Sequence, residues 1–289
     1  MKRLAGLMLV GLFLVSGCLN PTLAKDKKEK IPKGLKTKTA IDYKFVYPNG
    51  HKEESGEYNK VLNGKRIYQY DDKGNMIELA SYGADVKLIW KALPKYDDKG
   101  NQIEWATYGA DGRLEGKRLS KYDDKGNLIE WATYGADGKL ERKSLSKYDD
   151  RGNLIEVVAY GADGKLERKA LLSKYDDRGN PVEWARYGAD GKLTGKYLSK
   201  YDDRGNQIEE SGYGADGKLT GKCLFKYDDQ GNQIEESEYG ADGELTNESL
   251  SKYDDKGNLI EWAEYEERFG KVKEVPKFQT VWEYEFYKE

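Results

Sequence analysis

The feature that most constrains this chain is a tandem repeat. The hexad Tyr-Asp-Asp-x-Gly-Asn returns every 26 residues, with a single spacing of 27 that an extra Leu at Leu171-Leu172 causes. Its eight copies begin at Tyr70, Tyr96, Tyr122, Tyr148, Tyr175, Tyr201, Tyr227 and Tyr253. A fixed period of this length is typical of proteins in which one small supersecondary unit is stacked many times. The repeat therefore sets the architecture of residues 70–265.

Each repeat contains two turn signals. In the third copy, Asp123-Asp124-Lys125-Gly126-Asn127 and Gly135-Ala136-Asp137-Gly138 both place Gly where a type I turn with a G1 bulge needs a left-handed residue. The segments between the turns are short and rich in Tyr, Trp, Ile and Leu, as in β-strands. One repeat therefore predicts two strands and two chain reversals, and the array predicts an antiparallel meander without helices.

Counting residues from the turns predicts the strand register. With three-residue loops, Tyr122 faces Leu128 across the first turn. Counting inward, Ile129 faces Leu145, and Leu145 faces Val157 across the next turn. This register predicts a continuous Ile–Leu–Trp stripe along one face, because four other repeats have Trp at the position of Val157. These are Trp105, Trp131, Trp184 and Trp262.

The two unequal halves of the repeat shift the strand pairing by two residues per repeat, and a sheet sheared in this way must twist and then coil or close. We predict an all-β fold: an elongated, twisted antiparallel meander of two-stranded repeats that forms an open superhelical sheet. The alternative is a closed barrel. Three positions predict local irregularity: Val86 replaces a turn Gly, and Pro94 and Pro181 remove backbone donors.

The first 40 residues predict export and attachment. Lys2-Arg3 precedes the apolar run Leu4–Val15, which is too short for a membrane-spanning helix. Val15-Ser16-Gly17-Cys18 resembles the lipobox of bacterial lipoproteins. The resemblance implies that residues 1–17 are a signal peptide, that Cys18 carries fatty acids such as palmitate, and that Leu19 directs the protein to the outer membrane. The Lys-rich residues 18–40 predict a flexible tether.

Both ends of the array predict capping strands. Within residues 41–69, Tyr43 and Phe45 alternate with polar residues, and Pro48-Asn49-Gly50 and Asn63-Gly64 predict turns. Within residues 266–289, an alternating segment from Phe278 to Phe286 predicts a terminal strand that protects the last sheet edge.

The Tyr-Asp-x-x-Gly-Asn signature resembles the YD (Rhs-type) repeats of bacterial cell-surface and toxin-delivery proteins. The hairpin-per-unit layout is more distantly similar to MORN-type repeats. The resemblance to YD repeats covers Tyr70 to about Tyr265, although the period of 26 residues is longer than is typical of either family. It implies a β-strand array with a surface or binding role, and it transfers no catalytic residue to this chain.

Composition and motifs argue against several function classes. The net charge of −3 does not favour a nucleic-acid partner. Catalysis is poorly supported, because the only His is His51 and no base accompanies Cys223, which we expect to be buried. The Asp-Asp-x-Gly-Asn spacing matches no calcium loop, so we expect these side chains to bond the turns and predict neither metal nor cofactor. Charged residues on both strand faces disfavour a membrane-spanning barrel.

The aromatic residues are the candidate ligand surface. Trp105, Trp131, Trp184 and Trp262 recur at one register, and Glu210 and Glu236 occupy that register in two other repeats. Because an unpaired buried carboxylate is costly, we expect part of this face to be open to solvent. We therefore predict a non-enzymatic, lipid-anchored envelope protein whose β surface binds an envelope protein or a polysaccharide. The alternative is a structural spacer without a specific ligand.

Overall fold

The computed structural model describes residues 31–46, 59–268, 271–272 and 276–287. All regular elements of the described residues are β-strands. They are β1 (Leu35–Val46), β2 (Asn59–Tyr70), β3 (Met76–Gly83), β4 (Leu88–Tyr96), β5 (Gln102–Gly109), β6 (Leu114–Tyr122), β7 (Leu128–Gly135), β8 (Leu140–Tyr148), β9 (Leu154–Gly161), β10 (Leu166–Tyr175), β11 (Pro181–Gly188), β12 (Leu193–Tyr201), β13 (Gln207–Gly214), β14 (Leu219–Tyr227), β15 (Gln233–Gly240), β16 (Leu245–Tyr253), β17 (Leu259–Arg268), β18 (Lys271–Val272) and β19 (Phe278–Phe286).

The chain divides into two compact units. Unit 1 contains Leu93–Leu224 with Gly240–Gly243, and it is built of the antiparallel strands from β5 into β14. Unit 2 contains Lys30–Ala92, Phe225–Tyr239 and Glu244–Glu289, and it holds β1 to β4 together with β15 to β19. Within each unit, strands that follow one another along the chain pair as antiparallel neighbours, as the meander predicts.

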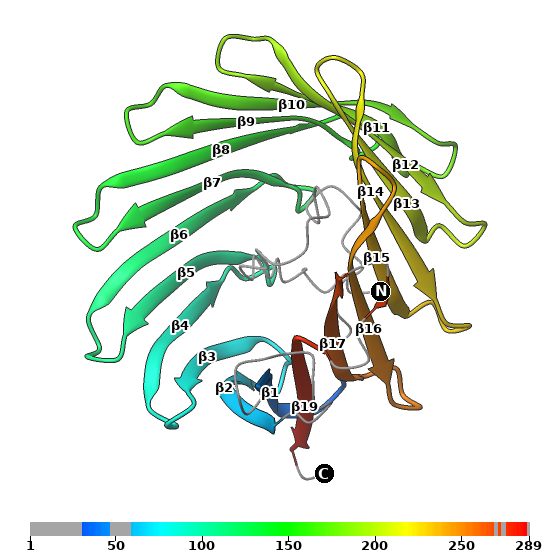
Figure 1. Cartoon of the computed structure of the whole chain (residues 1–289). Coiled ribbons are helices and arrows are strands. Elements are labelled where there is room, and N and C mark those ends of the chain that lie inside the picture. Colours follow the sequence, from blue (N-terminus) through cyan, green and yellow to red (C-terminus); the bar gives the residue numbers. More distant parts are fainter. Residues whose placement is uncertain (1–30, 47–58, 269–270, 273–275, 288–289) are drawn as a thin grey trace. The chain divides into compact units, whose positions relative to one another are not determined.

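The predicted open superhelical sheet is wrong, because the first and last strands of the array are hydrogen-bonded into one sheet within unit 2. β19 pairs with β1, from Leu35↔Phe286 to Lys44↔Phe278, and its other edge pairs with β17 (Figure 1). β1 in turn pairs with β2. The strand order is therefore that of a closed antiparallel barrel, which was the alternative. β19 does not cap a free edge but joins the two ends of the array.

Side chains also join β19 to β1 and β2. The Asp42 carboxylate accepts hydrogen bonds from Arg66 Nη2 at 2.9 Å and from Thr280 Oγ1 at 2.7 Å. The buried ammonium group of Lys38 lies between 5.7 and 5.8 Å from the ring centres of Tyr68, Trp282 and Tyr284. These contacts link residues from both ends of the sequence, and they stabilise the seam.

The Tyr-Asp-Asp-x-Gly-Asn turns have the side-chain hydrogen bonds that the sequence predicts. At Asp123, Oδ1 accepts from the backbone N–H of Asn127 at 2.8 Å, and Oδ2 accepts from the Asn127 amide at 2.9 Å. Gly126 follows with a φ of 85°, the left-handed conformation of a G1 bulge. The first Asp and the Asn of the motif are thus engaged in shaping the turn.

In five repeats, the Tyr of the motif connects the repeat to the one before it. The Tyr122 hydroxyl donates to the carbonyl oxygen of Gln102 at 3.0 Å, and the Tyr201 hydroxyl donates to that of Pro181 at 3.0 Å. Tyr148, Tyr175 and Tyr253 make the equivalent bond. The motif therefore needs a hydroxyl group as well as an aromatic ring.

Besides the G1 bulge at its turn, each hairpin has a second bulge within its strands. This second bulge overturns the predicted Ile–Leu–Trp stripe. Tyr122 faces Leu128 as predicted, but Lys121 faces Glu130, so Ile129 is an extra residue on β7. Leu145 consequently faces Glu130 and Val158 rather than Ile129 and Val157. The bulge also leaves this Ile exposed in repeat after repeat, at Ile77, Ile103, Ile129, Ile155, Ile208 and Ile260.

The three positions predicted to be irregular have different outcomes. Val86 adopts a φ of 61° and keeps the turn, with its N–H bonded to the Gly83 carbonyl at 3.0 Å. Pro94 lies within β4, and Pro181 is the first residue of β11. The predicted turn at Asn63-Gly64 is wrong: it is a bulge inside β2, where a Cβ on Gly64 would lie 2.6 Å from the Tyr82 carbonyl oxygen. The predicted turn at 48–50 lies outside the described residues.

Candidate functional site

Each strand presents alternate side chains to two faces, and these differ in chemistry. On β7, Glu130, Ala132 and Tyr134 lie on one face, which we call the glutamate face. Trp131 and Thr133 lie on the other, which we call the tryptophan face. Directly paired residues on neighbouring strands share a face, so the pairing shows which residues of the other strands lie on each face.

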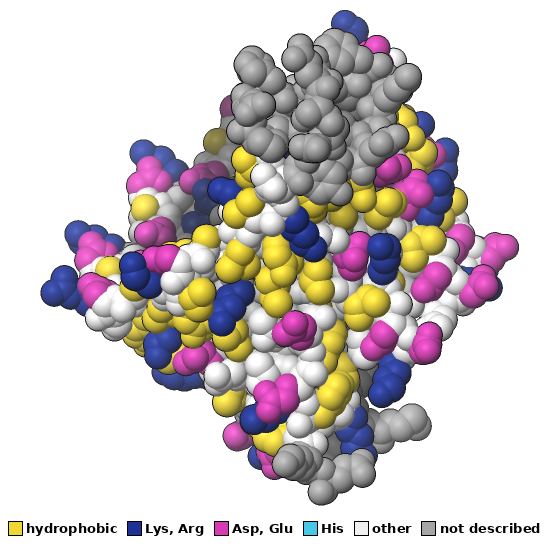
Figure 2. Space-filling model, turned by 60° about the horizontal axis from the view of Figure 1, so that its bottom comes forward, with side chains coloured by type: hydrophobic (Ala, Val, Ile, Leu, Met, Phe, Trp, Pro, Cys, Tyr) yellow, Lys and Arg dark blue, Asp and Glu magenta, His cyan; other side chains and the backbone are white. Residues whose placement is uncertain are grey.

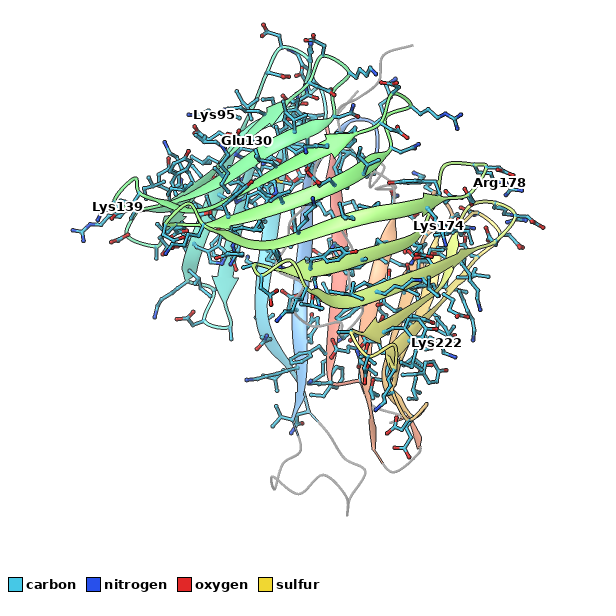
Figure 3. All side chains as sticks on the ribbon, turned by 90° about the horizontal axis from the view of Figure 1, so that it is seen from above. Lys95, Glu130, Lys139, Lys174, Arg178 and Lys222 are labelled. Atoms are coloured by element: carbon cyan, nitrogen blue, oxygen red, sulfur yellow. The ribbon has the colours of Figure 1, made fainter. Side chains whose placement is uncertain are left out.

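Ion pairs run across the strands of the glutamate face. Glu130 Oε1 lies 3.0 Å from Lys121 Nζ, and Glu130 Oε2 lies 3.1 Å from Lys143 Nζ. The same arrangement recurs around Glu156 and Glu183, and Figure 3 labels Glu130 and Lys174 of this series. The two lysines hold the pKa of Glu130 below its usual value. Lys121 is largely exposed whereas Glu130 is mostly covered, so these ion pairs lie at the surface of the glutamate face.

The four predicted Trp residues have different environments. Trp105 on β5 and Trp131 on β7 are partly exposed. Trp184 on β11 is 2% exposed and stacks on Tyr197, with ring centres 3.8 Å apart, so it is a core residue. Trp262 lies in unit 2, where it pairs with Ser251 and Thr280. Unit 1 therefore brings Trp105 and Trp131 onto one accessible face and removes Trp184 from it.

The spacing between successive Trp residues follows from the shear of the sheet. Trp131 pairs with Ser144, and Ser144 pairs with Ala159, two residues beyond the repeat equivalent Val157. The predicted shift of two residues per repeat is thus confirmed. Two strand spacings combined with two residues along the strand separate Trp105 from Trp131 by about 12 Å along a diagonal.

The two glutamates at the Trp register have different environments. Glu210 is 7% exposed, and its Oε2 accepts a hydrogen bond from Gln207 Nε2 at 3.2 Å. Glu236 accepts the equivalent bond from Gln233 at 3.1 Å. Glu210 is thus buried among polar neighbours, whereas Glu236 is partly exposed. Part of this face is open to solvent, as expected, but Glu at this register is not by itself evidence of it.

Arg118 is a residue of this face that the sequence reasoning missed. It pairs with Trp105 on one side and Thr133 on the other, while Ser120, two residues along β6, pairs with Trp131. Burial lowers the pKa of the Arg118 guanidinium. A comparison of repeats could have found it, because the other repeats have uncharged residues at this register: Ala92, Ser144, Ala170, Tyr197, Cys223 and Ser249.

The remaining predicted sites are placed as follows. Cys18 and His51 lie outside the described residues. Cys223 is buried on β14, as expected. No group of three or more potential metal ligands occurs among the residues that the structure describes. Nor does this part of the chain contain a helix with the length and apolar character of a membrane span.

Comparisons with known proteins place limits on what can be transferred to this chain. No protein-family model matches the sequence, and no curated protein matches it. Among solved structures, it is similar to a porin-like protein from Bacteroides uniformis, with a TM-score of 0.45 and 9% identity over 88% of this chain and 97% of that one. It is also similar to a DUF1329 family protein from Desulfovibrio piger, with a TM-score of 0.26 and 10% identity over 86% of this chain and 84% of that one.

A third likeness is to the TcdB2-TccC3-Cdc42 structure, with a TM-score of 0.22 and 11% identity over 81% of this chain and 19% of that one. At these scores none of the three carries an inference about function. The tandem β repeats that the resemblance to YD repeats implies are present in the structure. Membership of the YD or MORN families stays a prediction.

Proposed function

We propose that this chain is a non-enzymatic, lipid-anchored protein of the bacterial cell envelope that binds a polysaccharide on the tryptophan face of β5 to β8. The observation that carries the proposal is the pair of partly exposed Trp residues, Trp105 and Trp131, on one face about 12 Å apart. Large aromatic side chains surrounded by hydrogen-bonding groups are typical of ligand sites.

The neighbours of the two Trp residues support a sugar ligand. Thr107 and Thr133 occupy the same face, and the small side chains of Ser120 and Ser144 flank Trp131. Sugar rings lying on the two indoles would meet the hydroxyl groups of Thr107 and Thr133, which are partly exposed. The diagonal spacing suits a linear chain of sugars that crosses the strands.

Attachment by lipid, rather than by a sheet embedded in the bilayer, agrees with the distribution of charge. The glutamate face carries the Lys–Glu ion pairs, while the tryptophan face carries Arg118 and Glu210. Figure 2 likewise shows hydrophobic side chains interspersed with charged ones. A sheet that spans a membrane needs a continuous apolar band on its lipid-facing side. The lipobox at Cys18 supplies the anchor in this proposal, and the outer membrane is the destination that Leu19 favours.

The binding proposal is tested with the soluble form that lacks residues 1–18. Retention on insoluble glycan from the bacterial envelope is compared for the wild type, for Trp105→Ala with Trp131→Ala, and for Trp262→Ala. The last variant is the matched control, since it truncates a Trp at the same register in unit 2. We expect the double variant to lose retention with little change in Tm. A large drop in Tm with unchanged retention would make the two Trp residues structural and favour the spacer.

Anchoring is tested separately in cells by metabolic labelling with a fatty-acid analogue. Cys18→Ser removes the thiol that forms the thioether, so this variant should carry no label. Label that persists on the Ser variant would end the lipoprotein proposal.

A further inference from the structure

Arg118 is a partly buried cation that has no acidic partner among the described residues. The effects on its pKa are burial, which lowers it, and the neighbouring Tyr122, and no carboxylate contributes. By contrast, Arg66 in the seam donates two hydrogen bonds to Asp42, and Arg142 Nε lies 3.4 Å from Glu167 Oε2. Leaving a charge partly desolvated and unpaired destabilises a fold, because lost hydration is not replaced.

The fold itself does not require this cation. The residues at the same register in the other repeats are uncharged, and Ala92, Ser144 and Cys223 among them are buried. The strands around them keep the same pairing, as at Ser144, which lies between Trp131 and Ala159. A charged group that the architecture does without, and that lowers stability, is a candidate for a role in binding.

Resting on the proposed polysaccharide site, we infer that Arg118 binds the carboxylate or phosphate of an acidic saccharide whose ring stacks on Trp105. Arg118 and Trp105 are directly paired across β5 and β6, which places their Cβ atoms about 5 Å apart. This separation is comparable to the size of one sugar ring with its substituent. A guanidinium presents a planar pair of N–H donors that matches a carboxylate or phosphate group.

The position of Arg118 relative to the second Trp fits a linear acidic saccharide. Thr133 pairs with Arg118 and lies two residues from Trp131, so the cation stands between the two indole rings. An acidic sugar on Trp105 would direct its anionic group at Arg118, and the next part of the chain would reach Trp131. The paired Arg142 lies beyond Thr133 and is already engaged with Glu167.

The experiment measures binding of defined probes to the soluble form by calorimetry at low ionic strength. The probes are trigalacturonic acid, a phosphorylated trisaccharide and neutral maltotriose. The variants are Arg118→Ser, Arg118→Lys and, as a matched control, Arg113→Ala, whose side chain is 88% exposed on a turn. Arg118→Ser should weaken binding of an acidic probe about 10- to 100-fold. Arg118→Lys should retain part of the affinity, and Arg113→Ala should retain all of it.

The outcomes separate this inference from the proposal on which it rests. If the wild type binds acidic and neutral probes equally and Arg118→Ser changes neither, the inference is wrong while polysaccharide binding stands. If the wild type binds no probe and no envelope glycan, both are wrong. The acidic probe that binds tells whether carboxylate or phosphate is preferred.

Thermal unfolding without ligand gives an independent readout. Arg118→Ser should leave Tm unchanged or raise it, since an unpaired, partly buried charge is removed. A drop of several degrees would show that Arg118 is structural and would overturn the inference.

Discussion

Removing one hydroxyl group, in Tyr201→Phe, tests whether the motif Tyr holds neighbouring repeats together. The Tyr201 hydroxyl donates to the carbonyl oxygen of Pro181 at 3.0 Å, and Pro181 is buried. The change keeps the ring and its packing. It removes a hydrogen bond and leaves a buried acceptor without this donor, which destabilises by about 1.5 kcal/mol. In a chain of this size that corresponds to a fall in Tm of about 3–6 °C.

The assay is thermal unfolding followed by circular dichroism. The matched control is Tyr213→Phe on β13, whose hydroxyl makes no hydrogen bond to the described residues and whose loss should leave Tm nearly unchanged. Equal Tm values for the two variants would refute the reasoning, because they would show that the inter-repeat hydrogen bond contributes nothing to stability.

Three further predictions follow from the structure. Burial raises the pKa of Tyr201 to about 12. The protonated hydroxyl therefore contributes its full stabilisation below the unfolded pKa of about 10, and this stabilisation is lost as pH rises toward 12. The difference in Tm between wild type and Tyr201→Phe should shrink between pH 8 and pH 11, and a constant difference would contradict this. Val86→Gly should stabilise the protein by about 1 kcal/mol in denaturant unfolding, since the φ of 61° at Val86 is strained for a β-branched residue. Gly112→Val, at the equivalent turn, should destabilise the protein. Similar effects of the two substitutions would count against strain at Val86. Arg66→Ala should destabilise the protein by about 2–3 kcal/mol because it leaves Asp42 without its cation. Lys36→Ala, at an exposed ion pair, should change stability by less than about 0.5 kcal/mol. Equal effects in denaturant unfolding would show that the Arg66–Asp42 pair stabilises the seam no more than an exposed pair does.

Local features of the fold were predictable because they depend on neighbouring residues. The pairing of Tyr122 with Leu128 and the Asp123–Asn127 hydrogen bonds follow from turn chemistry within the hexad. The shift of two residues per repeat follows from the unequal half-repeats. The bulge at Ile129 was missed, since counting from a turn assumes unbroken alternation, and one extra residue moves every later side chain to the other face.

Features that depend on distant residues were not predictable from the repeat. Closure needs β19 to pair with β1, about 240 residues earlier, and no periodicity links these two segments. The burial of Trp184 was missed because Tyr197, on the next strand, covers its ring, whereas the equivalent neighbours are small or charged in other repeats. Arg118 was not predicted for a related reason, because it departs from the pattern that the repeats share.

The central structural claim is that β19 joins the two ends of the array, and an engineered disulfide between β1 and β19 tests it most directly. Thr39 and Glu283 are directly paired across these strands, a geometry that a disulfide can bridge. Thr39→Cys with Glu283→Cys is made in the form lacking residues 1–18 and carrying Cys223→Ser, so that the two new residues are the only cysteines. The matched control replaces Tyr284 instead of Glu283, which places the second cysteine on the opposite face. The closed strand order predicts nearly complete oxidation of the Thr39–Glu283 pair, seen by mass spectrometry of the folded protein, with little oxidation of the control. Failure of the Thr39–Glu283 pair to form in a folded β protein would contradict closure.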